Sequence, residues 1–188
     1  VPYRPRKWAR PFHAWLGRWA ALVLHRRAGK TTGIVNHHQR AAMDDGWETR
    51  RLRHVMPVIS DAHIASLLSP PTGRHYAHIL PTYKQAKLVV WDMLKFYARP
   101  ITREFNESEL LVRYPNGNKL QLFGADNPDS LRGIRLAGVS FDEYSQMSPA
   151  IFSEVLSKAL ADALGYAIFA GTIKGKNHLY KIHEAAKG

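Results

Sequence analysis

The chain alternates between short apolar runs and longer segments in which apolar residues recur with helical spacing. Apolar runs of strand length occupy residues 20–24, 76–80, 136–141 and 166–170. Segments with helical period or composition occupy residues 33–42, 83–99, 149–163 and 179–186. Short apolar runs indicate buried strands, and strands that alternate with helices are typical of a parallel sheet covered on both faces. The pattern therefore predicts an α/β fold.

The segment 83–99 is the longest predicted helix. Thr82 stands where a cap is expected, and Pro100 follows the last residue. The spacing places one set of apolar residues on its inner face: Ala86, Val89, Val90, Met93, Leu94 and Tyr97.

A β-hairpin is predicted after this helix. Two apolar runs at 110–114 and 119–123 flank a turn that contains Asn116-Gly117. Asn-Gly between such runs is the strongest short-range hairpin signal. The hairpin would add antiparallel strands to a mostly parallel sheet.

The remaining segments give weaker signals. A short helix is predicted from about Pro11, and Asp44-Asp45-Gly46 is a plausible helix stop. Asp61 is a candidate cap for a short helix at 61–68, before a Pro- and Gly-containing breaker at 69–73. No motif marks the segment 44–74.

Composition narrows the class of protein. Hydrophobic residues make up 45% of the 188 residues, as in a globular domain. The net charge of +12 favours a polyanionic partner, most simply nucleic acid. The chain has no cysteine, which excludes disulfides and thiolate metal sites and fits an intracellular protein. No apolar run approaches the ~20 residues of a membrane span.

The first candidate for chemistry lies between the strand at 20–24 and the helix at 33–42. It reads His25-Arg26-Arg27-Ala28-Gly29-Lys30-Thr31-Thr32. A strand that turns into a helix at Gly-Lys-Thr is the layout of a P-loop (Walker A motif), in which backbone N–H groups and the helix dipole hold phosphates. Lys30 would neutralise the β- and γ-phosphates of ATP, and the Thr31 hydroxyl would bind Mg²⁺. Leu24 replaces the usual first glycine, so the motif alone also fits an ordinary helix start.

A second candidate follows the strand at 136–141. Asp142 and Glu143 end this apolar run, as in a Walker B motif. In P-loop ATPases the first acid holds Mg²⁺ and the second orients the attacking water. The alternative is a pair of acids that merely begins a loop.

Three further residues are candidates with weaker signals. Thr172, after the strand at 166–170, could sense the γ-phosphate. Arg132 could act on a neighbouring subunit's γ-phosphate, or be a surface charge or a DNA contact. Trp8 could stack on the base of ATP, or simply cover the edge of the core.

Together these motifs resemble the ATPase domain of the large terminase subunit, the motor that packages DNA in tailed bacteriophages. The segments that carry the resemblance, in order, are 24–31, 81–86, 124–133, 141–147 and 170–178. The resemblance implies a P-loop NTPase fold of the RecA/ASCE type, with 1–188 as one ATPase domain, 1–18 as an adenine-side lead-in and 19–188 as the core.

The resemblance also implies roles for individual residues. Terminase P-loops often lack the first glycine and use an arginine, here Arg26, as an added phosphate ligand. Arg132 matches an arginine proposed to act in trans across a ring of subunits, and Thr172 lies in the motif that couples hydrolysis to movement. Ala9 stands near the place of the family's adenine-binding glutamine, so base recognition by a glutamine is not expected.

The implied partners are double-stranded DNA, a portal protein and a small terminase subunit, in the host cytoplasm, with a homo-oligomeric ring as the assembled form. Full large terminases also carry an RNase H-like nuclease domain. Residues 173–188 contain a single acid, Glu184, so we expect no nuclease activity from this chain. Alternative functions are a helicase-like repair ATPase and a non-hydrolysing DNA-binding module.

The histidines show no zinc-ligand spacing. His37-His38, His75 with His78, and His178 with His183 lack carboxylate or cysteine partners at suitable positions. We therefore predict that they are surface or phosphate-contacting groups, and we expect no metal other than Mg²⁺.

Overall fold

A computed structural model describes residues 3–173 and 175–186. Within them a seven-stranded sheet has the order β1-β7-β6-β2-β5-β4-β3. The strands are β1 (Trp19–Val23), β2 (His75–Leu80), β3 (Glu104–Asn106), β4 (Leu111–Arg113), β5 (Lys119–Gly124), β6 (Gly138–Phe141) and β7 (Tyr166–Gly171). The first five strands of this order, β1, β7, β6, β2 and β5, are parallel. The strand β4 pairs antiparallel with β5 on one side and with β3 on the other. This is the predicted mostly parallel α/β architecture with an added hairpin.

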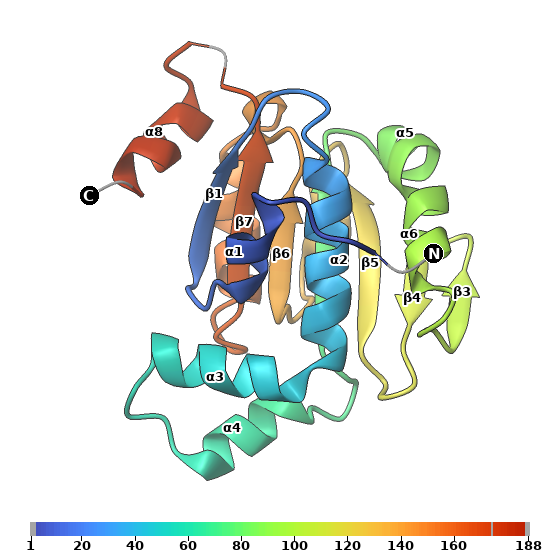
Figure 1. Ribbon diagram of the computed structural model, residues 1–188, viewed down its shortest axis with the longest axis vertical. Helices are drawn as coiled ribbons and strands as arrows, with labels where there is room; N and C mark the ends of the chain where they lie inside the picture. Colours follow the sequence, from blue (N-terminus) through green and yellow to red (C-terminus); the bar gives the residue numbers. More distant parts are fainter. Residues whose placement is uncertain (1–2, 174, 187–188) are drawn as a thin grey trace.

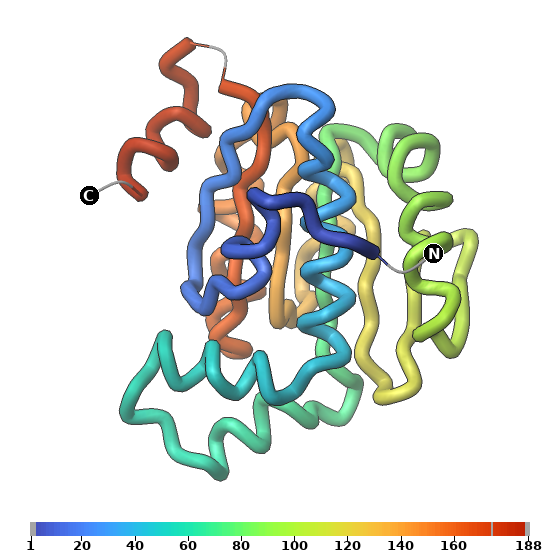
Figure 2. The backbone as a smooth tube through the Cα atoms, in the orientation of Figure 1, coloured from blue at the N-terminus to red at the C-terminus, as the bar shows by residue number. Residues whose placement is uncertain are grey.

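Helices cover both faces of the sheet (Figure 1). The α-helices are α1 (Ala9–Ala14), α2 (Lys30–Met43), α3 (Asp45–Val55), α4 (Asp61–Leu68), α5 (Tyr83–Gln85), α6 (Asp92–Ala98), α7 (Ser157–Ala159) and α8 (His178–Ala185). The π-helical segments are η1 (Ala86–Trp91) and η4 (Ile151–Leu156), and the 3₁₀ turns are η2 (Pro128–Leu131) and η3 (Tyr144–Gln146). Figure 2 shows that the chain crosses from β1 to α2 at one end of the sheet, where β6 and β7 also end.

The core has two main apolar clusters. One packs α1, α2 and the α5-η1-α6 helix against the sheet, and includes Ile34, Val90 and Leu94. The other packs η4 and α8 against it, and includes Phe141 and Phe169. No helix in the described residues is both long and apolar enough to cross a bilayer.

Local sequence signals placed most boundaries correctly. The Thr82 hydroxyl accepts a hydrogen bond from the Gln85 N–H and so caps the long helix. Gly117 has a positive φ of 82° in the hairpin turn, where the Asn-Gly pair predicted it. The cap of α4 is Ser60 rather than Asp61, because the Ser60 hydroxyl accepts from the His63 N–H.

Two expectations about the elements were wrong, and two elements were missed. Val89 is 64% exposed, because the π-helical segment η1 widens the helix and turns this residue outward. The helix predicted at 149–163 covers only 151–159. The helix α3 was not predicted, although Asp44 ends α2 and caps α3 through the Trp47 N–H. The edge strand β3 was also missed.

Candidate nucleotide site

The P-loop lies between β1 and α2, at the carboxyl end of the parallel strands. Gly29 is the N-cap of α2 and has a left-handed conformation with φ 81°, which glycine adopts at no steric cost. A Cβ at this position would also lie 3.2 Å from the Arg6 side chain. Gly29 therefore lets the chain turn sharply into the helix and leaves the N–H groups of its first turn available for an anion.

Lys30 is the first residue of α2 and its side chain folds back over the loop. Its ammonium group donates to the Leu24 carbonyl at 3.2 Å and to the His25 carbonyl at 3.3 Å. The residue is 7% exposed. Because these acceptors are neutral carbonyls, a phosphate would compete well for the same charge.

The Walker A and Walker B motifs meet directly. The Thr31 hydroxyl donates a hydrogen bond to Asp142 Oδ2, although the two residues are 111 positions apart in the chain. Asp142 is buried and its backbone N–H is held by the Ile79 carbonyl. A hydroxyl and a carboxylate are both hard oxygen ligands, so these residues fit Mg²⁺, which takes its other ligands from phosphate and water. No group of three or more His, Cys, Asp or Glu side chains in the described residues forms a separate metal site.

Glu143 follows Asp142 in an uncommon backbone conformation. Its φ is 57°, the left-handed region that non-glycine residues seldom adopt, and it begins the turn η3. Such strain persists where the surrounding structure fixes it, and it is concentrated at functional sites. The Gln146 N–H donates to the Glu143 carbonyl at 2.9 Å and holds the turn in place.

Thr172 reaches the P-loop from the end of β7. Its hydroxyl donates to the Leu24 carbonyl at 3.3 Å. This is the carbonyl that also accepts from Lys30. The strand order explains the contact, because β7 lies between β1 and β6 and its end therefore adjoins both motifs.

The N-terminal lead-in supports the loop from the side. The Trp8 indole N–H donates to the Ala28 carbonyl at 2.9 Å, and its ring would touch a Cβ at Gly33. The Arg6 guanidinium donates to the Arg27 carbonyl at 3.0 Å. Trp8 therefore braces the P-loop, and its stacking on adenine stays a prediction.

The other predicted phosphate ligands differ in exposure. Arg26 and Arg27 are exposed on the loop, and Ala28 is buried beneath it. Arg27 has a left-handed φ of 63°. Thr32 faces α6, where its hydroxyl lies 3.2 Å from the Met93 sulfur, so its side chain points away from the loop.

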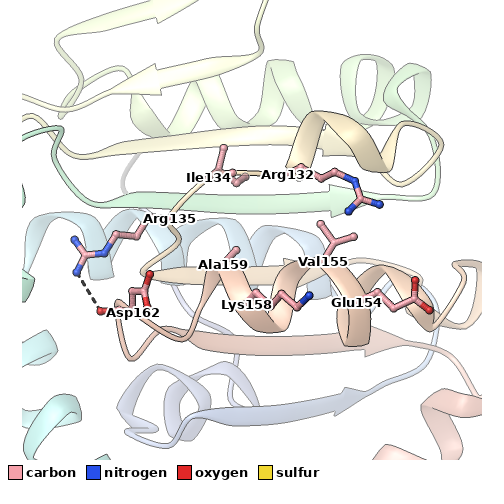
Figure 3. Close-up of a pocket in the computed structure, with 9 residues that line it drawn as sticks. Arg132, Ile134, Arg135, Glu154, Val155, Lys158, Ala159 and Asp162 are labelled. Carbon is pink, nitrogen blue, oxygen red and sulfur yellow. Dashed lines mark hydrogen bonds between the residues drawn. The ribbon is translucent and has the colours of Figure 1, made fainter.

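Arg132 lies on a pocket formed by the η2–β6 connection and η4. Its Nε donates to Asp129 Oδ1 at 2.9 Å in an exposed pair. Figure 3 shows its guanidinium toward the arrowheads of the strands, while Arg135 lies at the opposite end of the pocket and donates to the Asp162 carbonyl. Neither the ion pair nor the lining of this pocket includes a P-loop residue.

The prediction that the histidines lie on the surface was wrong for two pairs. His37, His38, His75 and His78 are buried, and burial lowers the pKa of each. They are buried because α2 turns most of its residues toward the core and all six residues of β2 are buried, which polar residue type alone did not reveal. His178 is half-buried and its Nε2 lies 2.8 Å from the Tyr144 carbonyl.

A β-strand, a glycine turn and a helix that begins with lysine, with a strand ending in a carboxylate one strand further along the sheet, define a P-loop NTPase fold. No family model and no curated protein matches the chain. Solved structures do match. The large terminase ATPase domain of Thermus phage P74-26 superposes with a TM-score of 0.68 and 22% identity, over 95% of this chain and 69% of that one.

The large terminase of a second thermophilic bacteriophage is similar too. It superposes with a TM-score of 0.63 and 19% identity, over 96% of this chain and 40% of that one. The same protein has been solved in complex with ADP and matches with a TM-score of 0.60. The chain thus has the fold of large terminase ATPase domains and spans less than half of this second protein.

Proposed function

We propose that this chain is a Mg²⁺-dependent ATPase, the motor domain of a phage large terminase that drives double-stranded DNA into a procapsid. The main support is the hydrogen bond from Thr31 to Asp142. It joins the hydroxyl and the carboxylate that would share one Mg²⁺, at the end of a sheet with the terminase fold. The metal would neutralise phosphate charge when bound.

Each residue of the site then has a role. Lys30 binds the β- and γ-phosphates after leaving its two carbonyl acceptors, and Arg26 adds a second positive charge from the exposed loop. Glu143 accepts a proton from the attacking water and orients it. Thr172 links the P-loop to β7, so that a change at the phosphates reaches the rest of the sheet.

Arg132 acts on the nucleotide of a neighbouring subunit in this proposal. Two observations support it: the side chain is exposed, and its contact within the described residues is an ion pair with Asp129. Exposed ion pairs contribute roughly 0–1 kcal/mol, so Asp129 would release Arg132 readily. The site would be complete only in a ring.

The net charge of +12 supports DNA as the polyanionic partner. The same proposal includes a portal protein and a small terminase subunit as partners. It also includes the host cytoplasm as the place of assembly. Nuclease activity is not part of it.

The decisive test is steady-state ATP hydrolysis as a function of protein concentration. We expect specific activity to rise with concentration, because the trans arginine requires a neighbour. Glu143→Gln should reduce turnover by roughly 10²–10⁴-fold and leave nucleotide binding intact. Loss of binding and turnover together would contradict the role of Glu143.

A mixing experiment isolates Arg132. Arg132→Ala and Glu143→Gln should each be inactive alone, the former by ~10³-fold or more. A mixture should regain activity, since some interfaces then combine an intact Glu143 with a neighbour's intact Arg132. No recovery, with activity independent of concentration, would make Arg132 a structural or DNA-contacting residue. Nucleotide binding without any hydrolysis would favour a non-hydrolysing module.

A further inference from the structure

Four buried polar side chains lie in a row on the sheet face that α2 covers. They come from four different elements and are all 0% exposed: His38 (α2), His78 (β2), Ser140 (β6) and Tyr166 (β7). Buried polar groups destabilise a fold unless hydrogen bonds satisfy them. Such a row in the centre of a core therefore calls for an explanation.

The row ends at the proposed metal ligand. The Tyr166 hydroxyl lies 2.8 Å from His38 Nδ1, and His38 Nε2 lies 2.7 Å from Ser140 Oγ. Ser140 Oγ also lies 2.7 Å from His78 Nδ1.

The last gap is longer. His78 Nε2 lies 3.9 Å from Asp142 Oδ2 and has no hydrogen-bond partner among the described residues. At that distance the two groups face each other without a hydrogen bond. Asp142 Oδ2 instead accepts from Thr31.

Proton counting selects one direction along the row. Both imidazoles are completely buried, and a neutral imidazole has one donor nitrogen and one acceptor nitrogen. If Tyr166 donates to His38 Nδ1, then His38 Nε2–H donates to Ser140, and Ser140 donates to His78 Nδ1. His78 must then carry its proton on Nε2, toward Asp142.

The opposite direction is unfavourable at both ends. The Tyr166 hydroxyl would accept from His38, and its own proton would have no acceptor among the described residues, where His38 is its one hydrogen-bond partner. His78 Nε2 would turn a lone pair toward the Asp142 carboxylate. A buried donor without an acceptor costs roughly 1–3 kcal/mol, and the two lone pairs repel.

We infer that His78 is a positioning residue for Asp142, and that the row Tyr166–His38–Ser140–His78 fixes its Nε2–H toward this carboxylate. The inference rests on the proposed function in taking Asp142 as a Mg²⁺ ligand. Partners of this kind set the orientation and basicity of the ligands that they contact.

The row adds a second donor beside Thr31. The Thr31 hydroxyl holds Asp142 by donating to Oδ2. His78 Nε2–H would be a further neighbouring donor that helps to keep the same oxygen in place when Mg²⁺ is bound. Because His38 belongs to α2, the P-loop helix and the Walker B carboxylate would keep their relative positions.

The direct test reads the tautomers of the nucleotide-free protein. Long-range ¹H–¹⁵N correlation spectra of ¹⁵N-histidine-labelled protein at neutral pH distinguish Nε2–H from Nδ1–H imidazoles. His78→Gln and His38→Gln identify the two rings by the signals that they remove. We expect both rings to carry the proton on Nε2. An Nδ1–H tautomer at His78, or a doubly protonated ring, would overturn the inference.

Two substitutions at His78 test the effect on metal binding. Glutamine places an N–H near Nε2, toward Asp142, whereas asparagine places one near Nδ1, toward Ser140. A fluorescent ATP analogue titrated with Mg²⁺ should require roughly 10–100-fold more Mg²⁺ for half-maximal binding in His78→Asn. His78→Gln should stay closer to wild type, and binding in EDTA should be equal in all three proteins.

Equal Mg²⁺ requirements for the two variants would overturn the positioning role. If both variants lose binding in EDTA too, His78 supports the fold alone, and the inference also fails. Failure of the proposed function is distinguishable from these results, because wild-type protein would then not bind the nucleotide at all, while the tautomer measurement would still report the direction of the row.

Discussion

The two faces of the sheet are both covered by helices, but they bury different kinds of side chain. The face under η4 and α8 is filled mainly with aromatic and aliphatic groups, among which Phe141 and Phe169 stack at 5.3 Å with an interplanar angle of 4°. Its one buried histidine among the described residues is His75, which contacts Phe123. The face under α2 buries His37, His38, His78, Ser140, Tyr166 and the Glu48–Arg51 ion pair. One face of the sheet is thus mainly apolar, and the other contains most of the buried polar groups.

The difference follows from the position of the P-loop helix. The apolar face requires only volume and shape, which many sequences supply. The face under α2 carries groups whose hydrogen bonds have direction, and these fix the angle and register of α2 against β6. Polar contacts that are fully satisfied favour a unique arrangement, and a nucleotide site needs one.

The largest effect on stability is expected from the apolar face. Phe169 contacts Phe141, Tyr144 and Phe152 within 5.3 Å between ring centroids. Phe169→Ala should lower the free energy of unfolding by roughly 3–5 kcal/mol through the cavity that it leaves. Urea denaturation measures this free energy. The control is Phe96→Ala, which should change the free energy of unfolding little because Phe96 is 54% exposed. Similar losses in both variants would mean that this face is loosely packed.

The same substitution on both faces gives the sharpest comparison. Tyr166→Phe removes the donor to His38 and leaves a buried acceptor unsatisfied, so it should cost roughly 1–3 kcal/mol. Tyr144→Phe on the other face removes a hydroxyl for which no hydrogen bond is present in the described residues, and it should cost little. If the two variants are equally stable, the polar row contributes no directional bonding.

Acid should destabilise the fold through its buried histidines, most of which lie on the face under α2. Burial lowers the pKa of His37 well below its ordinary 6.5, so the unfolded chain binds a proton that the folded chain does not. Stability is therefore complete above about pH 6.5 and falls as the pH decreases. Each histidine that stays neutral costs ~2 kcal/mol at pH 5.

His37→Leu tests that contribution. Urea unfolding at pH 7.5 and at pH 5 should show a loss on acidification that is smaller than in wild type by about 2 kcal/mol. The neutral ring at His37 has an Nε2 without a partner among the described residues, so the substitution should be tolerated at pH 7.5. An unchanged pH dependence would show that His37 is protonated in the folded state.

Sequence reasoning was accurate where signals are local. The P-loop turn, the cap at Thr82 and the Asn-Gly hairpin depend on neighbouring residues, and each lies where it was predicted. It was inaccurate for elements that depend on contacts between segments far apart in the sequence. Helix α3 was missed because its buried face includes Glu48 and Arg51, which pair with each other inside the core. The strand β3 exists only through its pairing with β4.

The same distinction applies to the site. Lys30, Thr31 and Asp142 were identifiable from their motifs, and the structure brings the last two into contact. The row of His38 and His78 was not identifiable, because strand order places β2 beside β6 and a periodic pattern contains no information on strand order. The exposed ion pair of Arg132 with Asp129 likewise could not be predicted from motif spacing.

One carbonyl oxygen, that of Leu24, accepts from both Lys30 and Thr172. A carbonyl has two lone pairs, and here two donors compete for its electron density. Departure of the lysine toward an anion would leave the threonine as the remaining side-chain donor and strengthen that bond. This one oxygen atom would thereby link ligand binding at the P-loop to Thr172 at the end of β7, and the link would require no large displacement of the backbone.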